Sequence, residues 1–185
     1  MLQPQLGPKT TDAVLQNYRL LLERLNAHIQ KVEAAFSDQI VCKKGCDACC
    51  RFLSLFPVEA FSISHAYSQL PENIKHQINH RLHHHKDACP LLIDHACALY
   101  PVRPIICRTH GFPIYIEKNN QVSIDFCPEN FKQVITFPEH TLLSIERLNE
   151  TLIAVNQLFL KSVTPHTHLP DRIPVSQALF ILDEF

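Results

Sequence analysis

Residues 42–50 read CKKGCDACC and bring four thiols into nine residues. The remaining cysteines follow at wider intervals, as Cys89, Cys97, Cys107 and Cys127. All eight therefore lie between residues 42 and 127, and the flanking segments contain none. Cysteine used only as a small apolar residue of the core would be scattered along the chain. The clustering indicates a functional site, with the flanking segments as its support.

The spacing of the first cysteines suits a metal centre. Cys42, Cys46 and Cys49 stand at i, i+4 and i+7, so their sulfurs can converge on two helical turns or in a tight loop. Thiolates are soft ligands that select zinc, Cu(I) or iron–sulfur clusters. A tetrahedral centre needs four ligands, so a fourth must come from farther along the chain. Cys50 adjoins Cys49 and points away from it, towards a second metal or into the interior as a buried thiol.

Eight thiols allow two four-thiolate sites, one such site with spare thiols, or one binuclear site, and the sequence does not choose among them. The candidate metal ligands are Cys42, Cys46, Cys49, Cys50, Cys89, Cys97, Cys107 and Cys127. The formal net charge is −1 with the thiols protonated, so binding as thiolates needs a metal cation to offset the added negative charge. The sequence leaves open whether the cofactor is zinc, iron or an iron–sulfur cluster.

Charged and imidazole side chains accompany the distal cysteines. Arg103 and Arg108 flank Cys107 and can supply charge or hydrogen bonds to thiolate sulfur, although surface salt bridging explains them equally well. His95 and His110 lie close in sequence to Cys97 and Cys107 and are candidate substitute ligands. With eight cysteines present, a supporting role beside the ligands is favoured over ligation itself. Four further histidines share one face of an expected helix, and we interpret them as a solvated surface: His76, His80, His83 and His84.

The composition is that of an ordinary soluble domain spanning residues 1–185. No basic excess suggests a nucleic-acid partner. Residues 1–19 lack the order of a signal peptide, and no apolar run approaches the roughly 20 residues of a membrane span. We therefore expect a cytoplasmic protein without a membrane partner. Thiols stay reduced there, so a cysteine cluster binds metal or takes part in catalysis more often than it forms disulfides.

Apolar periodicity predicts a mainly α fold: one helical domain with a loop-rich, cysteine-bearing centre. Long amphipathic helices are expected at about 10–36 and 138–163, with shorter ones opened by Pro57 and Pro71. Residues 88–128 are expected to be loop-like. Within them, 114–116 and 122–124 can pair as a small hairpin around Asn119-Asn120. A short apolar helix or strand at 174–183 closes the chain.

Four pieces of the sequence taken together resemble a known family. CKKGCDACC, CPLL, CALYPVRPIICR and a final CP are similar to the YkgJ-type cysteine-cluster family, described as a zinc- or iron-chelating domain. A related cysteine region occurs in flagellin lysine methylases. The resemblance covers residues 42–128, with all eight cysteines, Arg103, Pro104 and Arg108. It implies metal binding more firmly than any reaction.

Two alternatives to a simple metal-binding protein stay open. One is an iron–sulfur oxidoreductase or electron carrier; the CxxxCxxC spacing is also that of radical-SAM enzymes, although this chain is short for their barrel and has only three glycines. The other is a structural domain stapled by zinc or by disulfides. No nucleotide or flavin fingerprint is present, and the sequence names no catalytic residue, substrate or protein partner.

Overall fold

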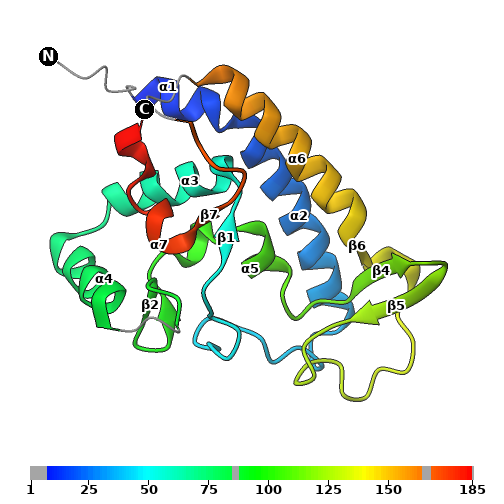
Figure 1. The fold of residues 1–185 in the computed structure, drawn as a ribbon. Coiled ribbons are helices and arrows are strands. Elements are labelled where there is room, and N and C mark those ends of the chain that lie inside the picture. Colours follow the sequence, from blue (N-terminus) through cyan, green and yellow to red (C-terminus); the bar gives the residue numbers. More distant parts are fainter. Residues whose placement is uncertain (1–7, 85–87, 164–167, 185) are drawn as a thin grey trace, which may run out of the picture.

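The computed structural model describes residues 8–84, 88–163 and 168–184, and these form a mainly helical fold, as the sequence predicts (Figure 1). The α-helices of the described residues are α1 (Pro8–Val14), α2 (Gln16–Ala35), α3 (Pro57–Ser68), α4 (Glu72–His84), α5 (Ile105–Thr109), α6 (Ile145–Ser162) and α7 (Val175–Ala178). Three short 3-10 helices are η1 (Tyr100–Val102), η2 (Glu139–Thr141) and η3 (Ile181–Glu184).

The main core lies where α2, α3 and α6 pack together. The two long helices α2 and α6 lie side by side, and α3 contacts α6 and the C-terminal segment (Figure 1). The buried stripe of α6 follows steps of three and four residues, through Leu148, Leu152, Val155 and Phe159, so one face of the helix is covered. Phe159 meets Phe61 of α3 with ring centroids 5.2 Å apart. The helices therefore form a scaffold from which the cysteine segment extends.

Two expected helix boundaries differ from the structure. The expected helix at 10–36 is divided into α1 and α2 at Leu15, where ψ is −1° and the backbone departs from helical geometry. The expected helix at 138–163 begins only at Ile145. Leu143–Ser144 (β6) is extended and pairs with β4 (Ile114–Lys118), and the Ser144 side chain accepts a hydrogen bond from the Arg147 N–H, which caps α6.

Short strands connect the helices around the cysteines. The predicted hairpin is present: β4 pairs antiparallel with β5 (Gln121–Asp125), and β6 adds in parallel on the other edge of β4. Asn119 and Asn120 form its turn at φ of 53° and 60°, in the left-handed region that such a two-residue turn requires. β1 (Ser54–Leu55) pairs with β7 (Ile173–Pro174), and β2 (Leu92–Ile93) pairs with β3 (Ala96–Cys97).

A second, smaller apolar cluster lies at the C-terminal end of α2. Its buried members are Val32, Phe112 and Phe131, and other phenylalanines pack against them. Phe131 meets Phe36, Phe126 and Phe137 at centroid distances of 5.2–5.6 Å, mostly edge to face. This aromatic cluster adjoins the segments that carry Cys42 and Cys127. None of the helices described here has the length and apolar character needed to span a membrane.

Candidate metal centre

Four of the cysteines lie on the connection between α2 and β1, which folds as two successive turns. The Cys46 N–H donates to Lys43 O, and the Cys50 N–H donates to Asp47 O, both at 2.9 Å. Gly45 lies in the first turn with φ of 103°, a conformation that glycine adopts without strain. The CxxxCxxCC motif is therefore a tight loop, which is one of the two local structures that its spacing allows.

The other four cysteines come from separate elements. Cys89 precedes β2, Cys97 ends β3, Cys107 lies in α5, and Cys127 follows β5. The Cys89 N–H donates to Cys50 O at 3.2 Å, which holds the β2–β3 hairpin against the motif loop. His95 at the tip of this hairpin donates from Nδ1 to Asp47 Oδ2 at 2.7 Å. The fold thus brings the distal cysteines back to the motif loop.

One set of thiols gathers around Cys42. Burial raises the pKa of the Cys42 thiol to about 11, and the nearby Cys127 and Cys46 sulfurs raise this pKa further. Burial likewise raises the pKa of Cys49, with Cys46 and Cys127 adding to the shift. We call Cys42, Cys46, Cys49 and Cys127 the first thiol group.

The remaining thiols form a second set. Burial raises the pKa of Cys107 to about 12, and repulsion from Cys89, Cys97 and Cys50 acts in the same direction. Burial is also the main cause that raises the pKa of Cys50 to about 12, and the nearby charges of Cys49, Cys89 and Cys97 raise it further. We call Cys50, Cys89, Cys97 and Cys107 the second thiol group. The neighbours Cys49 and Cys50 couple the two groups.

The donor chemistry of both groups suits a soft metal cation. All eight cysteines are free thiols, and no disulfide joins them. Within the described parts of the chain, no three His, Cys, Asp or Glu side chains lie close enough together to hold one metal ion. Burial first, and then the neighbouring thiols, raise the pKa values of Cys42 and Cys107, so a thiolate at either position is costly without a nearby cation. Four thiols per group match the four-coordinate demand of zinc and of iron–sulfur clusters.

The two arginines flanking Cys107 have different surroundings. The Arg103 charge opposes the burial that raises the pKa of Cys97 and Cys107, and its guanidinium lies 3.6 Å from the centroid of the Tyr100 ring. Arg108 is buried and donates to the carbonyls of Pro101 and Arg103 and to Asn26 Oδ1 of α2. Arg103 therefore supplies positive charge to the second thiol group, while Arg108 ties the η1 turn to α2.

Sequence reasoning missed three residues that hold these segments. Glu59 of α3 is buried, and its carboxylate accepts the N–H groups of Ile105 at 3.0 Å and Phe56 at 3.2 Å, so it fixes the start of the helix that carries Cys107. Asn130 and Gly111 lie against the first thiol group. Asn130 had a sequence signal, because an asparagine two residues after the Cys127-Pro128 pair suits a turn. Glu59 had none, since its partners are distant in sequence.

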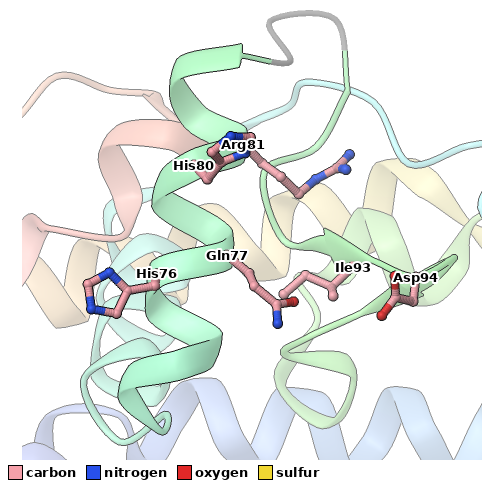
Figure 2. Close-up of a pocket in the computed structure, with 6 residues that line it drawn as sticks. All are labelled: His76, Gln77, His80, Arg81, Ile93 and Asp94. Atoms are coloured by element: carbon pink, nitrogen blue, oxygen red, sulfur yellow. The ribbon is translucent and has the colours of Figure 1, made fainter.

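The histidine-bearing helix α4 packs beside β2 and forms a surface pocket with the β2–β3 hairpin. His76 and His80 line this pocket, and Figure 2 shows Gln77 and Arg81 directed towards Ile93 and Asp94. His80 and His84 stack with ring centroids 4.2 Å apart, and His84 Nδ1 lies 2.8 Å from His80 O. These rings contact one another and the helix backbone, and their interpretation as a solvated surface stays a prediction.

The described residues form a mainly helical scaffold that carries clustered free thiols. Residues 41–128 match the family model CxxCxxCC, described as a "Putative zinc- or iron-chelating domain". This segment, a little under half of the chain, holds all eight cysteines, and its match to the family model agrees with the resemblance that its motifs predict. No curated protein and no solved structure shows significant similarity to the chain.

Proposed function

We propose that this protein binds zinc or iron at two four-thiolate sites, one in each thiol group. The observation that supports the proposal is the division of the thiols by their neighbours. After burial, Cys46 and Cys127 are the thiols that raise the pKa of both Cys42 and Cys49, whereas Cys89 and Cys97 raise the pKa of both Cys50 and Cys107. Thiols that disfavour a neighbouring thiolate in this way lie near one another, and a shared cation would offset their negative charge. Of the arrangements that the sequence leaves open, two separate sites follow best from this division.

The adjacent residues Cys49 and Cys50 serve different groups. Successive side chains diverge in extended or turn backbone, so neighbouring thiols reach different centres more easily than they reach one. The hydrogen bond from the Cys89 N–H to Cys50 O directs this part of the loop towards the β2–β3 hairpin. The geometry therefore favours two sites over one site with spare thiols.

The two sites differ in their surroundings. Cys46 and Cys49 of the first thiol group are exposed, whereas each cysteine of the second group is at least partly buried. Cys89 and Cys97 pack against the main core. We assign a structural role to the second site, where bound metal adds directly to folding stability. The first site is open to exchange of metal with a partner, and an iron–sulfur cluster there would supply electron transfer.

The experiment is a metal analysis of protein purified without oxygen, with zinc, iron and acid-labile sulfide measured on one sample. We expect one metal centre in each group, and Cys46→Ser and Cys107→Ser should each remove one centre and spare the other. Iron matching sulfide, with an absorbance band near ~400 nm, would identify clusters, and a colourless zinc protein would identify chelation of zinc. Loss of all metal from either variant, with its fold intact, would contradict two separate sites.

A further inference from the structure

Asn130 is a fully buried polar residue that ties three segments together beside the first thiol group. Its side-chain oxygen accepts the N–H groups of Val41 at 2.9 Å and Cys42 at 3.2 Å. Its side-chain nitrogen donates to Gly111 O at 2.7 Å. Its own backbone N–H donates to Cys127 O at 2.9 Å. Asn130 therefore holds both ends of the first thiol group in register with the loop after α5, Cys42 through its carboxamide and Cys127 through its backbone N–H.

The side-chain nitrogen of Asn130 and the Cys42 sulfur lie on either side of the same point beside Gly111, 3.1 Å and 2.9 Å from the position that a Cβ atom there would take. The carboxamide therefore holds the Cys42 backbone from within the same closely packed space that contains the Cys42 sulfur. A carboxamide suits this place because it accepts backbone N–H groups with one atom and donates with the other.

The surroundings leave Asn130 little freedom. A Cβ atom at Gly111 would lie 2.9 Å from Cys42 Sγ, 3.1 Å from Asn130 Nδ2 and 3.5 Å from Cys127 Cβ, so these groups are in close contact around the Gly111 backbone. On the other side, Phe131 belongs to the aromatic cluster and donates its N–H to Gln39 O at 2.7 Å. The amide is thus fixed by packing as well as by hydrogen bonds.

We propose that Asn130 is a positioning residue for metal binding at the first thiol group, holding the Cys42 backbone with its side-chain oxygen and the Gly111 backbone with its side-chain N–H. The inference rests on the proposed function and deepens it, because it names a residue outside the cysteines on which one of the two sites depends. A purely structural role would resemble that of Asn156, another buried asparagine, whose side-chain oxygen accepts the Val58 N–H at 3.1 Å within the helical core.

The test compares Asn130→Asp with Asn156→Asp in the full chain. Aspartate keeps the shape of the side chain and the accepting oxygen, but it removes the N–H that Asn130 donates to Gly111 O. Metal-free protein is titrated with Co²⁺ against a competing chelator, and the thiolate-to-cobalt absorbance reports each site as it fills. We expect Asn130→Asp to weaken one site by about 10–100-fold and to leave the other unchanged, as for other partners of metal ligands. Asn156→Asp should leave both affinities at the wild-type values, whatever its effect on stability.

Each outcome has one meaning. If wild-type protein does not bind Co²⁺ at two thiolate sites, the proposed function fails, and the inference about Asn130 fails with it. If the wild type has two sites and Asn130→Asp binds as tightly at both, or loses affinity equally at both, the positioning role alone is overturned. Urea unfolding of the metal-free variants shows whether each one folds. Should Asn130→Asp not fold, Asn130→Ser, which is uncharged and smaller, is read by the same criteria.

Discussion

Gly111→Ala offers the sharpest test of the packing around the first thiol group, because Gly45 provides a matched control. Both glycines have positive φ, 95° at Gly111 and 103° at Gly45, so alanine is strained at either position. Such backbone strain costs of order 1–3 kcal/mol. The two sites differ in space: an added Cβ at Gly45 meets nothing within 4 Å, whereas at Gly111 it lies 2.9 Å from Cys42 Sγ.

The additional cost at Gly111 follows from this overlap. Ordinary contact between such atoms lies at about 3.5–4.0 Å, so the new methyl group is too close to Cys42 Sγ and to Asn130 Nδ2. Asn130 cannot yield cheaply, because it is fully buried and hydrogen-bonded to two chain segments. Overpacking of this kind costs about 1–3 kcal/mol beyond the backbone strain. It also displaces the Cys42 sulfur, so metal at the first thiol group should be lost.

The assay is urea unfolding of the metal-free variants, combined with metal analysis of the proteins as purified. Gly111→Ala should be less stable than Gly45→Ala by about 1–3 kcal/mol, from the overpacking alone. Gly111→Ala should also lack the metal of one site, while Gly45→Ala retains both. Equal stabilities together with equal metal contents would refute the account of close packing at Gly111.

Two further predictions concern the thiols and the histidines. The folded, metal-free protein raises the pKa of the Cys42 and Cys89 thiols to about 11 and of the Cys50 and Cys107 thiols to about 12, above the ordinary 9.0. The protonated thiols therefore contribute to the free energy of unfolding in full below pH 9.0, and this contribution is lost as the pH rises through 11 to 12. Urea unfolding at a series of pH values should show this loss in metal-free protein and a smaller loss in metal-bound protein; identical pH profiles would contradict it. The double variant His80→Ala/His84→Ala should keep the wild-type metal content, because these rings stack on each other and His84 contacts the helix backbone. Loss of metal from a folded double variant would show instead that the α4 histidines are ligands.

Features that depend on neighbouring residues could be predicted from the sequence. Pro57 and the residue after Pro71 begin α3 and α4, because proline suits the start of a helix. The Asn119-Asn120 turn closes the β4–β5 hairpin for a similarly local reason. The start of α6 could not be predicted in this way. The pairing of β6 with β4 joins residues far apart in sequence and keeps residues 143–144 extended.

The same distinction holds for the candidate site. The cysteines stand out in the sequence because residue type and spacing alone mark them as ligands. Their division into two groups depends on where the β2–β3 hairpin, α5 and the end of β5 return to the motif loop, which spacing does not encode. The roles of Asn130 and Glu59 depend on hydrogen bonds to Val41 and Ile105, across 89 and 46 residues. A buried polar side chain shows its partner only in the folded chain.

The two thiol groups rest on different parts of the fold, and this gives them different consequences for stability. The second group is joined to the main core, because Glu59 holds the start of α5 and Cys89 and Cys97 pack on the core residues. The first group rests on Asn130 and on the small aromatic cluster at the end of α2. Under the two-site proposal, removing metal from the second group should disturb contacts that involve α3 and α5, whereas removing it from the first should disturb the motif loop and the segments that Asn130 joins. The proposal therefore predicts that metal can be released or exchanged at the first group while the second keeps the chain folded.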